Sequence, residues 1–138
     1  MQRTTQNILL VDDQDSTRQL LQNNLAMLKD EADLHSVIWS YQHANNAVQA
    51  IKSFNQYQPA LVFLDIELPD QSGLYLLEKF KDINKDCFVV MVSGVSTLEN
   101  VRTSIKSGAS SFIVKPFTGD KILSVLKQYD RYLHQIKK

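Results

Sequence analysis

One apolar run constrains the fold of this chain more than any other stretch. The five residues Ala60–Leu64 are all apolar, and Asp65 follows them directly. A short run of this kind, placed between Pro59 and Pro69, predicts a strand that is buried on both faces. Such strands belong to parallel sheets covered by helices. Because open parallel sheets bind ligands at the carboxyl ends of their strands, Asp65 is predicted to lie where the fold does its chemistry.

Strand-like runs and helical patterns alternate five times along the chain. The predicted strands are Ile8–Val11, Val37–Trp39, the run ending at Asp65, Phe88–Val92 and Ser111–Val114. The segments between and after them carry apolar residues at helical spacing. The predicted buried positions of these five helices are Leu20, Leu21, Leu25 and Leu28; Ala47, Val48, Ala50, Ile51 and Phe54; Leu74, Leu76, Leu77 and Phe80; Leu98, Val101 and Ile105; and Ile122, Leu123, Val125, Leu126, Tyr129 and Leu133.

Local signals set the expected ends of these helices. Asp15 or Ser16 is predicted to cap the first helix, and Asn45 or Asn46 the second. Gly108 is predicted to end the fourth. The alternation as a whole predicts an α/β fold, with one five-stranded parallel sheet and helices on both of its faces.

Composition limits the function classes. The chain has 138 residues, 43% of them apolar, and a formal net charge of zero. This predicts a single domain over residues 1–138 and argues against a dedicated nucleic-acid surface. The single Cys87 is predicted to be a core thiol in a reducing compartment. No apolar run approaches the roughly 20 residues that span a bilayer, and Met1–Asn7 lacks a signal-peptide core, so a cytoplasmic protein without membrane contact is expected.

Four of the predicted strands end in polar groups. These are Asp12 and Asp13 after the first strand, Asp65 and then Glu67 after the third, Ser93 after the fourth, and Lys115 after the fifth. A sheet order of 2-1-3-4-5 would make these four strands neighbours, with the switch point of the sheet between the first and the third. Each group alone has an ordinary explanation as a helix cap, a turn residue or a surface lysine. Their joint occurrence at successive strand ends favours one common site.

The charges indicate what such a site would bind. Crowded carboxylates raise one another's pKa values, and a divalent cation would relieve the repulsion. Oxygen ligands suit Mg²⁺ or Mn²⁺, and a zinc site is disfavoured because no His or Cys accompanies the cluster. A cation, the Lys115 ammonium and the Ser93 hydroxyl together could receive a phosphoryl group. Aspartate is also a nucleophile towards phosphorus, so Asp65 could form an aspartyl-phosphate.

Several of these segments match a known family. The matching segments are Ile8–Asp13, Leu64–Pro69 with Gly73, Val92–Gly94, Gly108-Ala109 and Phe112–Phe117. Together they resemble the receiver domain of bacterial two-component response regulators, most closely the free-standing kind seen in the chemotaxis regulator. The resemblance covers about residues 7–130. It implies a flavodoxin-like fold with strand order 2-1-3-4-5.

The resemblance also implies roles for individual residues. Asp65 would be the phosphoacceptor and a metal ligand. Asp13 would bind the metal directly, Asp12 partly through water, and Glu67 through its backbone carbonyl. These assignments make Mg²⁺ or Mn²⁺ the expected cofactor.

Three further residues would respond to phosphorylation. Ser93 would be the switch hydroxyl and Lys115 the lysine that pairs with the phosphoryl group. Phe112 would be an aromatic switch that turns inward when Ser93 moves. The resemblance also implies that the Lys115-Pro116 bond is cis, a state that X-Pro bonds reach at low cost.

A signalling module rather than an enzyme follows from this resemblance. A sensor histidine kinase or a histidine phosphotransfer protein would supply the phosphoryl group. A downstream protein would bind the face formed by the fourth helix, the fifth strand and the fifth helix. The resemblance leaves open whether phosphorylation brings two copies together.

Three other readings stay open at this point. An aspartyl-nucleophile phosphohydrolase would place an acid/base carboxylate where Glu67 stands, although the chain has no substrate-specificity insertion. The chain could be the receiver part of a longer multidomain regulator. It could also be a receiver-like scaffold that is never phosphorylated, against which the complete acidic set argues.

The sequence departs from the family pattern at a few positions. Many relatives carry a neutral or varied residue where Glu67 stands, and a carboxylate there could pair with Lys115, bind the metal or obstruct water. We hypothesise that Glu67 alters the lifetime of the aspartyl-phosphate. Leu68 replaces the more usual methionine, a volume-conserving change expected to be mild. Phe112 lacks the hydroxyl of a tyrosine, so its inward state would gain no hydrogen bond.

Overall fold

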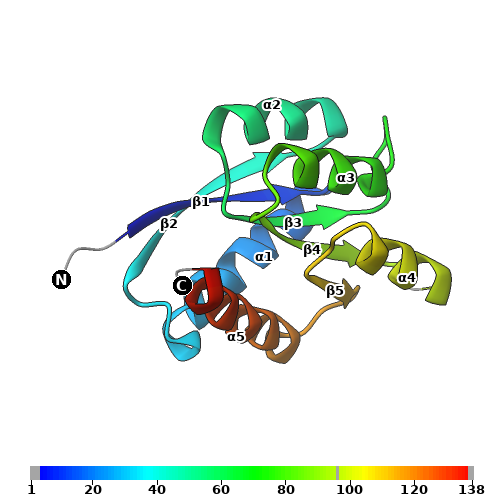
Figure 1. Ribbon diagram of the computed structural model, residues 1–138. Coiled ribbons are helices and arrows are strands. Elements are labelled where there is room, and N and C mark those ends of the chain that lie inside the picture. The colour runs from blue at the N-terminus through cyan, green and yellow to red at the C-terminus, as the bar shows by residue number, and fades with distance from the viewer. Residues whose placement is uncertain (1–3, 96, 137–138) are drawn as a thin grey trace.

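The sheet has five parallel strands in the order β2-β1-β3-β4-β5, which confirms the predicted order. The computed structural model describes residues 4–95 and 97–136 (Figure 1). The strands are β1 (Thr4–Val11), β2 (Val37–Ala44), β3 (Leu61–Asp65), β4 (Phe88–Ser93) and β5 (Ser111–Val114). The helices are α1 (Asp15–Leu28), η1 (Asp30–Ala32, a 3₁₀ turn), α2 (Ala47–Tyr57), α3 (Gly73–Ile83), α4 (Leu98–Lys106) and α5 (Gly119–Ile136).

The helices cover both faces of the sheet, with α2 and α3 on one face and α1 and α5 on the other (Figure 1). Successive strand residues point to opposite faces, so Ile8 and Leu10 of β1 pack under α1 and α5. Leu9 and Val11 of the same strand pack under α2 and α3. This two-sided burial explains why the central strands read as unbroken apolar runs. Cys87 is fully buried, as predicted.

The second strand is longer than predicted. It extends to Ala44 rather than ending at Trp39, because β1 begins at Thr4 and the two strands pair from Thr4–Val37 to Val11–Ala44. Polar residues in β2, including His43, concealed this extension in the sequence. An edge strand with one neighbour and one open side tolerates such residues, because they remain in contact with water.

Some predicted helix faces are wrong. Leu20 in α1 and Val48 in α2 are exposed, because each lies beside the buried face of its helix and not on it. In α4 two of the three predicted buried positions are wrong, because Leu98 is 65% exposed and Ile105 is 53% exposed. Val101, the third predicted position, is partly buried, and the buried Ser104 completes the inward side of α4.

The helix ends follow local chemistry in most places. Asn46 caps α2 by accepting a hydrogen bond from the Gln49 N–H at 2.8 Å, as predicted. Gly108, with φ at 105°, follows the end of α4, also as predicted. The expected cap of α1 is wrong, because its N-cap residue is Gln14 and its side chain makes no capping bond. The Gln14 N–H instead donates to the Asp12 carboxylate at 2.9 Å, which ties Asp12 to the turn after β1.

Candidate functional site

Three carboxylates meet at the carboxyl edge of the sheet. Asp12 and Asp13 follow β1, Asp65 ends the adjacent strand β3, and each offers an oxygen within 4.8 Å of those of the other two. Asp12 and Asp65 are only 4% and 5% exposed, whereas Asp13 is exposed. The strand order therefore brings together three of the four acidic residues that the sequence predicted to share a site.

Lys115 follows β5, the outermost strand next to β4, and its side chain reaches this cluster along the same carboxyl edge of the sheet. Its Nζ donates to one carboxylate oxygen of Asp12 at 2.5 Å and to one of Asp65 at 3.0 Å. The Lys115 N–H donates to the Ser93 carbonyl at 2.9 Å, which continues the β4–β5 pairing to the sheet edge. The Lys115-Pro116 peptide bond is cis, as the resemblance implied.

Burial and charge act in opposite directions on these groups. Burial raises the pKa of Asp65, while the Glu67 N–H and the Lys115 ammonium partly offset the shift. Burial also works to lower the pKa of Lys115, but its bonds to Asp12 and Asp65 outweigh that cost and raise the pKa. Asp65 is thus a poorly hydrated carboxylate whose burial is partly compensated by the Glu67 N–H and by a neighbouring cation.

The loop after Asp65 is folded back on itself. The Glu67 N–H donates to the Asp65 carboxylate at 3.0 Å, and Glu67 also forms an isolated β-bridge with Ser72. The Gly73 N–H donates to the Ile66 carbonyl at 2.7 Å. A Cβ on Gly73 would collide with the backbone carbonyl of Asp65, so this close approach requires glycine.

The Glu67 side chain is exposed, and the two ion pairs of Lys115 within the described residues are to the aspartates. Of the three suggested roles for the Glu67 carboxylate, pairing with Lys115 is therefore wrong. The backbone of Glu67, by contrast, is held directly against the Asp65 carboxylate.

Ser93 ends β4 at this edge, but its side chain and that of Phe112 in β5 contact groups outside the carboxylate cluster. In the β3–β4 pairing Asp65 stands opposite Val92, so Ser93 is one residue further along. The buried Ser93 hydroxyl accepts from the Val95 N–H at 3.1 Å and lies 3.4 Å from the Val95 carbonyl, to which it donates. Phe112 is partly buried against the core under α2 and α3.

The donor set at this edge fits a hard divalent cation. It consists of three carboxylates, two of them buried, and no His or Cys belongs to the cluster within residues 4–95 and 97–136. Carboxylate oxygens at one edge, one of them exposed to water, are what Mg²⁺ and Mn²⁺ prefer. The residues present therefore fit the metal that the sequence predicted.

One charged residue beside the site was not predicted. Arg18 in α1 is buried, pairs with Asp15 and lines a cavity of about 10 Å³ together with Asp12 and Thr17. Its Nε has no hydrogen-bond partner in the described part of the chain. The Asp15–Arg18 spacing of three residues within a helix was the one sequence signal for this pair.

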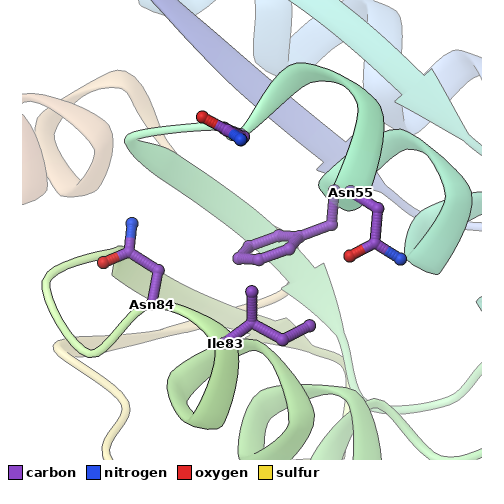
Figure 2. Close-up of a pocket in the computed structure, with 5 residues that line it drawn as sticks. Asn55, Ile83 and Asn84 are labelled. Carbon is purple, nitrogen blue, oxygen red and sulfur yellow. The ribbon is translucent and has the colours of Figure 1, made fainter.

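A separate hollow lies far from this chemistry. It has a volume of about 300 Å³ and is lined by Phe54, Asn55 and Gln58 at the end of α2 and by Ile83 and Asn84 at the end of α3 (Figure 2). These helix ends lead into the starts of β3 and β4, so the hollow is at the opposite edge of the sheet from Asp65. Its lining offers amides and apolar groups and no ionisable side chain.

Among the helices of the described residues, none combines the length and the apolar character needed to cross a lipid bilayer.

Comparison with known proteins gives a consistent result. The family model for the response regulator receiver domain matches residues 8–127. The chemotaxis protein CheY of Bacillus subtilis is 30% identical over 121 residues, which cover 88% of this chain and 94% of that protein. A putative NtrX-like response regulator of Rickettsia felis is 36% identical over 124 residues, but the match covers only 24% of that longer protein.

Solved structures show the same fold. A CheY-like response regulator receiver domain protein from Methanospirillum hungatei has a TM-score of 0.77 at 28% identity, with 96% of this chain and 99% of that chain covered. The receiver domain of NtrX from Brucella abortus has a TM-score of 0.74 at 35% identity, with 92% and 98% covered. The chain therefore belongs to the receiver-domain family of two-component response regulators.

Proposed function

We propose that this protein is a phosphoacceptor response regulator in which Asp65 receives a phosphoryl group from a partner histidine kinase or phosphotransfer protein. A carboxylate oxygen of Asp65 would attack the phosphorus of a phosphohistidine. The phosphorus–nitrogen bond would break, and its electron pair would return to the imidazole of the donor. The observation that carries this proposal is the position of Lys115, whose ammonium lies 3.0 Å from the Asp65 carboxylate.

The neighbouring residues have complementary roles in this proposal. Asp12, Asp13, Asp65 and the Glu67 carbonyl would hold Mg²⁺ or Mn²⁺, which when bound neutralises charge on the phosphoryl oxygens. Lys115 would exchange part of its ion pairing with Asp12 and Asp65 for a bond to the transferred group. Because the ammonium is already in place, little reorganisation is needed at the moment of transfer.

Phosphorylation would then be sensed by Ser93 and Phe112. The Ser93 hydroxyl is bonded to the backbone of Val95, so a bond to the phosphoryl group would compete with these contacts. Release of Val95 would loosen the segment that leads into α4. Phe112 is only partly buried, and in this proposal it would turn to a more buried position. The site would bias two arrangements of this region rather than create a new one.

The readout surface in this proposal is the face of α4, β5 and α5. Leu98 and Ile105 of α4 and Val95 before it are exposed apolar side chains. Exposed apolar groups that gather on one face mark a surface for protein contact. We assign this face to a downstream protein, or to a second copy of the chain after phosphorylation.

The proposal is tested by incubating the protein with acetyl phosphate, with and without Mg²⁺, and measuring intact mass. We expect the mass of one added phosphoryl group, dependent on Mg²⁺ and lost in Asp65→Asn. The matched control is Asp82→Asn, which removes an exposed carboxylate on α3 and should label as the wild type does. Labelling that persists in Asp65→Asn would refute the assignment of the phosphoacceptor.

A second candidate function rests on the free Glu67 carboxylate. An aspartyl-nucleophile phosphohydrolase needs an acid or base two residues after its nucleophile, and the Glu67 side chain is exposed and not paired with Lys115. This reading predicts repeated turnover of p-nitrophenyl phosphate that is lost in both Asp65→Asn and Glu67→Gln. The receiver proposal predicts labelling of Asp65 without such turnover.

A further inference from the structure

A carboxylate from the loop after Asp65 caps a different helix. Asp70 lies near the tip of the β3–α3 loop, which rises beside the start of α2 (Figure 1). One Asp70 oxygen accepts from the Ala47 N–H at 2.8 Å, and the other accepts from the Val48 N–H at 3.1 Å. The two partners are 23 and 22 residues away in the chain, so this contact is tertiary.

These bonds complete the start of α2. The first N–H groups of a helix have no partner within the helix. In α2 the Gln49 N–H is bonded to the Asn46 side chain, and the N–H groups of Ala47 and Val48 are left for Asp70. A negative charge at this end also interacts favourably with the helix dipole. The pKa of Asp70 lies below its ordinary value, first because the Ala47 N–H donates to it.

The same loop carries the backbone that touches Asp65. At its base, the Glu67 N–H is bonded to the Asp65 carboxylate, and the Gly73 N–H is bonded to the Ile66 carbonyl. At its tip, Asp70 is bonded to α2. The position of the Glu67 backbone is therefore set from two sides, by the sheet edge and by a helix on the face above it.

We infer that Asp70 is a positioning residue for the site: by fastening the loop tip to α2, it holds the Glu67 backbone against Asp65. This inference rests on the proposed function, in which the Glu67 carbonyl is a metal ligand. Asp70 itself touches neither the metal site nor the phosphoryl group. Its removal should therefore weaken metal binding and slow phosphoryl uptake without abolishing either.

The test compares Asp70→Ala with Asn46→Ala. Both remove capping bonds from α2, but only Asp70→Ala frees the loop. Mg²⁺ affinity is measured by calorimetry, and the initial rate of labelling by acetyl phosphate is measured by mass spectrometry. We expect Asp70→Ala to weaken Mg²⁺ binding about tenfold, as loss of a residue that orients a ligand does elsewhere, and to slow labelling. Asn46→Ala should leave both values unchanged while lowering thermal stability.

Hydrogen exchange provides a readout independent of phosphorylation. Amides of residues 66–72 should exchange faster in Asp70→Ala and as in the wild type in Asn46→Ala. If Asp70→Ala unfolds, Asp70→Asn replaces it, because Asn keeps one acceptor oxygen and should give smaller effects in the same direction.

Two results would overturn the inference. One is an Asp70→Ala protein with wild-type Mg²⁺ affinity, labelling rate and loop protection. The other is an Asn46→Ala protein that loses Mg²⁺ affinity to the same extent, which would reduce the effect to general loosening of α2. Failure of the wild type itself to be labelled at Asp65 would count against the proposed function, and the exchange data would still decide whether Asp70 anchors the loop.

Discussion

The ammonium nitrogen of Lys115 lies 3.0 Å from a carboxylate oxygen of Asp65, although 50 residues separate the two in the chain. The same nitrogen lies 2.5 Å from an oxygen of Asp12. One cation thus serves two buried carboxylates, and the cluster with Asp13 retains excess negative charge when all three aspartates are ionised. This imbalance makes the edge receptive both to a divalent cation and to a phosphoryl group that Lys115 can pair with.

Replacing Lys115 should separate these two kinds of binding. Lys115→Met removes a positive charge from the carboxylates, so Mg²⁺ is expected to bind more tightly, while labelling by acetyl phosphate slows about 100-fold because the phosphoryl oxygens lose a donor. Calorimetry and the labelling rate measure the two effects. Lys121→Met, which removes an exposed lysine from α5, is the control and should change neither. Wild-type labelling by Lys115→Met would contradict the role proposed for the ammonium.

Asp13 is the exposed member of the acidic cluster, so its loss should affect metal binding more than folding. Asp13→Asn is expected to weaken Mg²⁺ binding about tenfold or more, because one anionic ligand disappears. In the absence of metal the same variant should be more stable than the wild type by about 1 kcal/mol, since repulsion from Asp12 and Asp65 is relieved. Urea unfolding with and without Mg²⁺ measures both changes. A variant that loses stability in metal-free buffer would show that Asp13 has a structural partner instead.

The sequence was a good guide to the sheet because four strands are marked by their ends. Central parallel strands are buried on both faces and therefore appear in the sequence as apolar runs, each followed by a polar residue at the carboxyl edge of the sheet. This is why the sequence alone predicts Asp12, Asp65, Ser93 and Lys115 at one edge of the sheet. Strand β2 was underestimated because an edge strand can keep polar residues such as His43.

The sequence was a poor guide where the partner of a side chain comes from elsewhere in the fold. The apolar residues of α4 predicted a buried face, yet Leu98 and Ile105 are exposed. The sequence pattern of an apolar surface for protein contact is the same as that of a face packed on the core, so the sequence did not distinguish the two. The Asp70 bonds to α2 gave no signal, because an aspartate after a proline is ordinary turn chemistry. Arg18 is buried beside a small cavity that it lines together with Val11 of β1, Phe63 of β3 and Val92 of β4, and its own segment does not reveal these neighbours.

Gly73 is expected to be the least replaceable glycine near the site. In Gly73→Ala the new Cβ would stand 2.8 Å from the Asp65 carbonyl carbon, so β3 and α3 must move apart. We expect a loss of about 2 kcal/mol of stability and slower labelling, since the phosphoacceptor shifts with its backbone. Gly94→Ala is the matched control, because nothing lies within 4 Å of its added Cβ, and its stability should change by less than about 0.5 kcal/mol. Equal stability of the two variants would contradict the tight packing at Gly73.

Glu67 should set the lifetime of the phosphorylated state through its side chain. Its backbone is bonded to Asp65, whereas its carboxylate is exposed and free of Lys115, which leaves it able to obstruct water that approaches the phosphoryl group. Glu67→Ala removes both bulk and charge and is expected to shorten the aspartyl-phosphate half-life about threefold. Glu67→Gln keeps the bulk and should shorten it by less. The half-life is measured by loss of labelled protein after acetyl phosphate is removed. A longer half-life in either variant would point to Glu67 as a base for water attack, and equal rates in all three proteins would remove Glu67 from the reaction.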